Sequence, residues 1–187
     1  TLENVRTKDI STVHGFSEWK LRHAFYLPPS WRWNVVKFAH KVFAACDALE
    51  KYDGVGVWLD ADCVTFKTIP EGLIESQVKD YYIAHYGRTG HYTETGLWIM
   101  NCAHPEHAKF LTSWRNIYLS GKFRQLHEWH DCTSLDETMR RFKREGKITT
   151  RNLSGKHHLE MHPNALSELG EYIDHCKGAR KGKGYSA

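Results

Sequence analysis

A short apolar run near the middle of the chain ends in two aspartates, and this feature constrains the fold more than any other. Residues 55–59 read Val-Gly-Val-Trp-Leu, and Asp60-Ala61-Asp62 follows directly. A continuous apolar run of this length predicts a strand that is buried on both faces of a sheet. Because ligands of open α/β sheets gather at the carboxyl ends of the strands, the two carboxylates are expected at a binding edge.

Two carboxylates at one point suit a hard divalent cation, Mg²⁺ or Mn²⁺, and such an ion suits a diphosphate. Asp60 and Asp62 are therefore candidate metal ligands. The same pattern is also ordinary turn chemistry, because aspartate side chains accept hydrogen bonds from nearby backbone amides. A second, independent feature is needed to choose between these two interpretations.

Size and composition limit the class of protein. With 187 residues, 41% hydrophobic content and seven tryptophans, the chain is long and apolar enough to bury a core, which excludes a disordered chain. The length fits one domain over residues 1–187. No apolar stretch reaches the roughly 20 residues that cross a bilayer, so we expect no membrane association. Five scattered cysteines without C-x-x-C spacing indicate reduced thiols and a cytoplasmic location rather than a zinc or disulfide framework.

Hydrophobic spacing predicts an α/β order of elements. The strongest helix is expected over residues 34–52, where apolar side chains recur every three or four positions and Asn34 can cap the start. Strands are expected at 55–59, 81–86 and 96–102, and helices at 105–119, 133–145 and, shorter, 167–175. Lys37 and Lys41, one turn apart in the first helix, either face a phosphate or lie on a solvated surface.

The second feature lies near the C-terminus, where His175 begins the segment His-Cys-Lys-Gly-Ala-Arg-Lys. An imidazole can complete the coordination sphere of a Mn²⁺ held by Asp60 and Asp62. Gly178 allows backbone to approach a ligand, and Lys177, Arg180 and Lys181 can bind phosphate. The alternative is a solvated basic end, which is common in proteins.

These segments resemble a known family. Asp60-Ala61-Asp62 resembles the DxD motif of GT-A glycosyltransferases, and His175-x-x-Gly178-x-x-Lys181 resembles the HxxGxxK motif of family 8 glycosyltransferases. Glu94-Thr95-Gly96 with Asn101 is similar to that family's Asn-Ser-Gly…Asn stretch, with Glu94 in place of Asn. His130-Asp131 and Asp136 are similar to its Asp-Gln-Asp segment. The resemblance extends over residues 31–184 and includes small glycosyltransferase-like proteins of phages and bacteria.

The resemblance implies a GT-A-like (Rossmann-like) fold with a mixed, mainly parallel sheet flanked by helices, whose N-terminal nucleotide-binding strand is missing or shortened here. It implies transfer of a sugar from a nucleoside diphosphate, with UDP-sugar as donor, to a hydroxyl of a glycan, a small molecule or a hydroxymethylated DNA base. Mn²⁺ or Mg²⁺ would bind Asp60, Asp62 and His175, with Lys177, Gly178, Arg180 and Lys181 at the diphosphate. Glu94 and Asp131 are the candidate catalytic residues for the acceptor hydroxyl.

Two other functions use some of the same residues. A metal-dependent nuclease or phosphohydrolase would use the carboxylates and the histidine to activate water. A non-catalytic nucleic-acid-binding module would use the basic C-terminal segment and exposed aromatic side chains.

Overall fold

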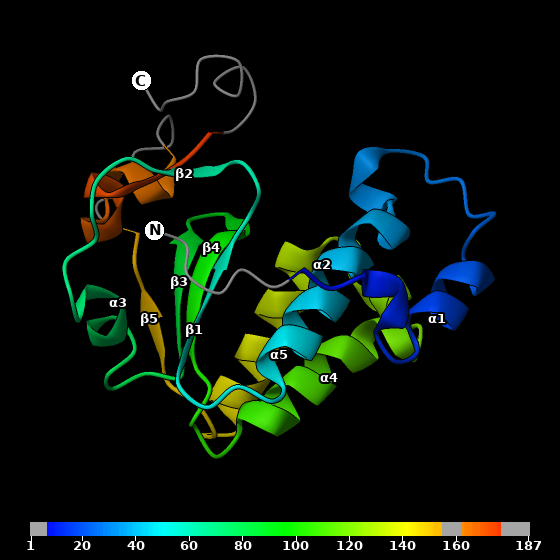
Figure 1. Cartoon of the computed structure of the whole chain (residues 1–187). Helices are drawn as coiled ribbons and strands as arrows, with labels where there is room; N and C mark the ends of the chain where they lie inside the picture. The colour runs from blue at the N-terminus through cyan, green and yellow to red at the C-terminus, as the bar shows by residue number, and fades with distance from the viewer. Residues whose placement is uncertain (1–6, 155–161, 177–187) are drawn as a thin grey trace.

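The computed structural model describes residues 7–154 and 162–176 and shows a mixed α/β arrangement (Figure 1). A four-stranded sheet in the order β1-β4-β3-β5 has helices α2, α4 and α5 packed on one face. A second, two-stranded sheet pairs β2 with β6. The expected α/β class with helices flanking a mixed sheet is confirmed.

The described residues form α-helices, β-strands and short 3₁₀ helices. The helices are α1 (Phe16–Arg22), α2 (Val35–Leu49), α3 (Leu73–Ser76), α4 (His107–Leu119) and α5 (Asp131–Arg144). The strands are β1 (Val55–Leu59), β2 (Cys63–Thr65), β3 (Ile83–Arg88), β4 (His91–Asn101), β5 (Thr150–Asn152) and β6 (Ile173–His175). Short 3₁₀ helices are η1 (Ile10–Thr12), η2 (Trp31–Trp33), η3 (Lys122–Gln125), η4 (Pro163–Leu166) and η5 (Glu168–Glu171).

The sheet is mostly antiparallel, so the expectation of a mainly parallel sheet is wrong. β4 pairs antiparallel with both β1 and β3, and only the β3–β5 pair is parallel. The reason is local: β3 and β4 form a hairpin around Thr89-Gly90, and Gly90 has a φ of 72°, which favours glycine. A two-residue turn joins only antiparallel neighbours, so β4 returns beside β3 and takes the place next to β1.

Within the described residues, β4 and β3 are the inner strands of the sheet, and β1 is an edge strand. Trp98 and Met100 of β4 belong to the core under α2, α4 and α5, whereas Leu97 and Ile99 belong to a smaller core on the opposite face. The expectation that residues 55–59 are buried on both faces is wrong, because alternate side chains of β1 remain exposed. An apolar run therefore predicted the strand correctly, but not its position in the sheet.

The helix before β1 forms as its sequence predicts. Asn34 caps α2, since its Oδ1 accepts a hydrogen bond from the Lys37 backbone amide at 3.1 Å. The apolar face of the helix, from Val35 to Leu49, is buried against the sheet and α4. The helix ends at Leu49, three residues before the predicted end, and a turn then leads into β1.

The last described segment folds back onto the middle of the chain. A 3₁₀ turn, η5, and the strand β6 replace the single short helix that was predicted for residues 167–175. β6 pairs antiparallel with β2, and Cys63 lies opposite His175 in that register. The chain thereby brings the segment after β1 next to the C-terminal histidine. Within the described residues, no helix has the length and apolar character needed to cross a membrane.

Candidate functional site

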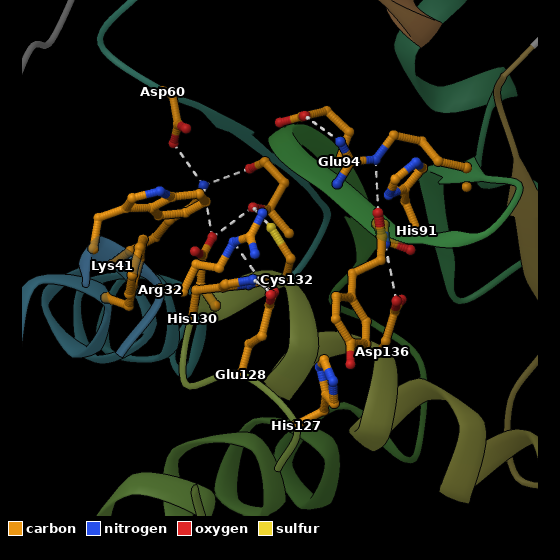
Figure 2. A pocket seen from close by; sticks show the side chains of 18 of the residues that line it. Arg32, Lys41, Asp60, His91, Glu94, His127, Glu128, His130, Cys132 and Asp136 are labelled. Carbon is orange, nitrogen blue, oxygen red and sulfur yellow. Dashed lines mark hydrogen bonds and ion pairs between the residues drawn. The ribbon is translucent and has the colours of Figure 1, made fainter. Parts of the chain in front are cut away.

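A cavity of about 1080 Å³ opens between the helical layer and the sheet edge. Its walls come from α2, the end of β1, the β3–β4 hairpin and the chain that leads into α5, and Figure 2 shows their side chains around one space. Four of the carboxylates singled out from the sequence line it, namely Asp60, Glu94, Asp131 and Asp136. The cavity is therefore the place where the predicted carboxylates can meet a common ligand.

Lys41 joins two of these carboxylates at the wall of the cavity. Its ammonium lies 2.7 Å from Asp60 Oδ1 and 3.1 Å from Asp131 Oδ2, and it donates a hydrogen bond to the Thr95 carbonyl at 2.6 Å. The Lys41 side chain is only 14% exposed. The interpretation of Lys41 as part of a solvated helix surface is thus wrong, whereas Lys37, one turn earlier, is exposed and lines the same cavity.

The surroundings of Lys41 keep it charged. Burial by itself lowers the pKa of the ammonium, but the carboxylates of Asp131 and Asp60 together outweigh burial, so the pKa lies above its ordinary value. The Trp58 ring adds to this, because the ammonium lies 5.5 Å from its centroid. The cavity therefore has a fixed positive charge between two negative ones.

Asp131 occupies the first turn of α5, directly after the N-cap residue His130. Its Oδ2 accepts a hydrogen bond from the Thr95 hydroxyl at 2.5 Å in addition to the Lys41 contact. A carboxylate in the first turn of a helix is also favoured by the helix dipole. Asp136, one turn later, accepts a hydrogen bond from the Thr93 amide at 2.9 Å and so attaches α5 to β4.

Asp60 and Asp62 follow the same strand but have different partners. Asp60 Oδ1 accepts a hydrogen bond from the Trp58 indole at 2.7 Å and pairs with Lys41. Asp62 Oδ1 lies 3.0 Å from His175 Nε2. The β2–β6 pairing holds this contact, because the backbone amide of Cys176 also donates to the Asp62 carbonyl at 2.9 Å.

The structure therefore brings Asp62 and His175 together across 113 positions of sequence. The Cys63 sulfur belongs to the same group, since one ligand atom from each of Asp62, Cys63 and His175 lies within 4.8 Å of the others. Asp60 does not belong to that group within the part of the chain that the structure describes. A single ion bound by both aspartates and His175 would require the Asp60 carboxylate to leave Lys41.

Glu94 is buried and lies near Nδ1 of the His175 ring, whereas Asp62 lies near Nε2. Its Oε1 accepts a hydrogen bond from the Gly96 amide at 3.0 Å, and its Oε2 lies 3.6 Å from an Arg88 guanidinium nitrogen. Gly96 is essential to this packing because a Cβ there would lie 1.9 Å from His175 Cε1. The sequence Glu94-Thr95-Gly96 thus provides a buried carboxylate and the space for an imidazole beside it.

Aromatic side chains form another wall of the cavity, which sequence reasoning missed. His130 stacks on Trp31 with ring centroids 6.1 Å apart and meets Phe38 and Tyr92 edge to face. Trp31 is 61% exposed although it lines the cavity. Trp129, which precedes His130, is half-buried at the margin of the core and packs edge to face against Trp33 and Phe123.

The predicted phosphate-binding residues Lys177, Gly178, Arg180 and Lys181 lie outside the described residues. Comparison of the chain with protein-family models, curated proteins and solved structures found no match.

Proposed function

We propose that this protein is a metal-dependent glycosyltransferase with a GT-A-like fold, which moves a sugar from a nucleoside diphosphate, UDP-sugar in the first instance, to a hydroxyl acceptor. The contact between Asp62 and His175, 3.0 Å apart, is the observation that carries the proposal. It joins the Asp-x-Asp segment after β1 to the histidine that begins the C-terminal His-x-x-Gly-x-x-Lys segment, as a shared cation site requires.

The donor atoms at this contact suit the expected cation. A carboxylate oxygen and an imidazole nitrogen are ligands of Mn²⁺, and Mg²⁺ accepts the carboxylate with additional waters and phosphate oxygens. Asp62 and His175 would hold the ion, with Asp60 as a further ligand once its carboxylate leaves Lys41. When bound, the ion would neutralise negative charge that develops on the departing diphosphate.

The cavity supplies the other groups that the reaction needs. In the transfer, the bond between the anomeric carbon and the diphosphate oxygen breaks, and a bond from that carbon to the acceptor oxygen forms. The acceptor hydroxyl loses its proton, which Glu94 or Asp131 can accept, since both carboxylates line the cavity. Lys41 and Lys37 carry positive charge on the α2 wall, and in a site that excludes water such charges stabilise phosphate oxygens strongly.

The aromatic wall of the cavity suggests the chemical class of the acceptor. The stacked Trp31 and His130 rings offer an aromatic face beside the carboxylates, and such a face suits the apolar side of a sugar ring or a base. A glycan, a small molecule and a hydroxymethylated DNA base all satisfy this requirement. We propose an acceptor with a ring and a free hydroxyl.

A nucleotide-release assay tests the proposal. The protein is incubated with Mn²⁺ and a panel of nucleotide sugars, and free nucleoside diphosphate is measured with and without EDTA. We expect release that EDTA abolishes and that Asp62→Asn and His175→Ala reduce at least a hundredfold. Full activity in either variant would contradict the proposed site. Nicking of plasmid by Mn²⁺-loaded protein without any sugar donor would instead favour the nuclease or phosphohydrolase alternative.

A further inference from the structure

A second group of metal-ligand side chains lies around the other nitrogen of the His175 ring. Glu94, His162 and His175 each offer one ligand atom, and these atoms lie within 4.8 Å of one another. Glu94 Oε1 is 3.7 Å from His175 Nδ1, and Glu94 Oε2 is 3.7 Å from His162 Nε2. The two imidazole rings meet edge to face with centroids 4.9 Å apart. Three ligand atoms thus converge on one point from β4, β6 and the start of η4.

The group is buried, and one of its atoms lacks a partner. The side chains of Glu94 and His175 are each 2% exposed, and that of His162 is 10% exposed. Among the described residues, His162 Nε2 is a buried nitrogen with no hydrogen-bond partner. A buried polar atom in that condition costs free energy, because it has lost water without gaining a replacement. A cation at the convergence point would supply the partner.

Asp62 orients His175 for such a role. Histidines that bind metal usually donate their other ring N–H to a carboxylate, which fixes the tautomer and the ring orientation. His175 Nε2 lies 3.0 Å from Asp62 Oδ1, so a proton on Nε2 leaves the Nδ1 lone pair directed toward Glu94 and His162. Gly96 supports the arrangement because any larger residue would displace the ring.

We propose that Glu94, His162 and His175 form a binding site for a borderline transition-metal cation, with Zn²⁺ as its representative. Two imidazole nitrogens and one carboxylate are a donor set that suits Zn²⁺ and leaves a fourth position for water or a ligand. Metal–ligand bonds of about 2.1 Å in a tetrahedron place ligand atoms roughly 3.4 Å apart. Each Glu94 oxygen lies 3.7 Å from one imidazole nitrogen, and the three ligand atoms lie within 4.8 Å of one another, so metal binding requires the three side chains to move closer together.

The site does not depend on the proposed sugar transfer, but it has a consequence for it. A neutral imidazole has one lone pair, so His175 binds a metal through Nδ1 at this site or through Nε2 beside Asp62, and not through both. The nitrogen-rich group favours Zn²⁺, whereas Mn²⁺ and Mg²⁺ favour oxygen ligands such as Asp62. Zn²⁺ bound here should therefore compete with Mn²⁺ for His175 and inhibit Mn²⁺-dependent activity.

Metal binding should also move a proton on His162. The Asn164 amide donates to His162 Nδ1 at 3.3 Å, which leaves the ring proton on Nε2 in the metal-free protein. Coordination through Nε2 requires that this proton move to Nδ1 or be released. The nitrogen chemical shifts of His162 report which tautomer is present, and the exchange of tautomers is a signature that a purely structural histidine would not show.

A zinc titration of the whole chain tests the site. Zn²⁺ is titrated against a chromophoric chelator with the wild-type protein and with the variants His162→Ala, Cys63→Ser and His14→Ala. We expect one tightly bound equivalent, at least tenfold weaker binding in His162→Ala, and unchanged binding in the other two. His14 is an exposed histidine and controls for surface binding. Cys63→Ser separates this site from the neighbouring group of Asp62, Cys63 and His175.

Several results would overturn the proposal. Wild-type binding by His162→Ala, loss of binding in Cys63→Ser, or absence of zinc binding by the wild-type protein would each do so. If His162→Ala does not fold, the cobalt spectrum of the wild-type protein decides. Tetrahedral Co²⁺ bands without a thiolate charge-transfer band support the site, and a thiolate band contradicts it. If the wild-type protein binds zinc but transfers no sugar when Mn²⁺ is supplied, that result would contradict the proposed function and leave the zinc site standing.

Discussion

Replacement of Lys41 by methionine should destabilise the protein strongly, because the ammonium is the only cation that the described residues place against Asp131. The Asp131 side chain is 6% exposed, and without Lys41 its carboxylate would lose its counter-ion in a poorly hydrated position. Removal of one partner from a buried ion pair costs about 3–5 kcal/mol. Asp60, at 32% exposed, can regain water, so we expect the lower end, about 3 kcal/mol.

The assay is denaturant unfolding monitored by circular dichroism, and Lys37→Met is the matched control. Lys37 lies one turn earlier on the same helix and is exposed, so its replacement should change the free energy of unfolding by less than about 0.5 kcal/mol. The double variant Lys41→Met/Asp131→Asn should recover at least ~1 kcal/mol relative to Lys41→Met, because the buried charge is gone. A cost for Lys41→Met below about 1 kcal/mol, or no recovery in the double variant, would refute the reasoning.

Three further predictions follow from local geometry. Gly96→Ala should displace the His175 ring, since the added Cβ would lie 1.9 Å from Cε1, and zinc and manganese binding should both weaken at least tenfold; retained binding would contradict the packing. Burial lowers the pKa of His85 to about 4, so between its ordinary pKa of 6.5 and about 4 the unfolded chain binds a proton that the folded chain does not. The free energy of unfolding should therefore fall as pH drops through that range, and His85→Gln should flatten the slope, which unfolding curves at several pH values will measure. Burial also raises the pKa of the Cys63 and Cys132 thiols to about 12, so both should react slowly with a disulfide reagent at pH 8 until urea unfolds the protein; fast labelling of either thiol in the native state would contradict this.

The sequence predicted the elements better than their arrangement. The spacing of apolar residues every three or four positions predicted α2, because a helix that buries one face repeats apolar residues with that period, and Asn34 predicted its cap. The apolar run of β1 located a strand, but burial of alternate residues depends on the neighbouring strands, which no local pattern encodes. The β3–β4 turn at Thr89-Gly90 lacks the Asn-Gly or Asp-Gly pair that marks a two-residue hairpin, so the sequence did not predict this antiparallel pair.

In the candidate site, too, the sequence predicted some residues, but contacts that depend on the tertiary fold could not be predicted. The resemblance of two distant segments to glycosyltransferase motifs predicted that Asp62 and His175 lie close together. The β2–β6 pairing does place them in contact. The role of Lys41 could not be predicted, since an isolated lysine on a helix is usually solvated and only the tertiary fold reveals two carboxylates around it. The role of His162 could not be predicted either, because its proximity to Glu94 arises from the return of the chain through η4.

The most direct test of the central claim is a thermal-shift measurement on the whole chain with UDP-sugars, in the presence and absence of Mn²⁺. A ligand that binds only the native state raises the melting temperature, so joint binding of metal and nucleotide should give a shift that neither gives alone. The account predicts that this joint shift disappears in Asp62→Asn and persists in Lys122→Ala, a change in η3 outside the cavity walls. A shift that is identical without metal, or that survives in Asp62→Asn, would contradict a cation held by Asp62 and His175.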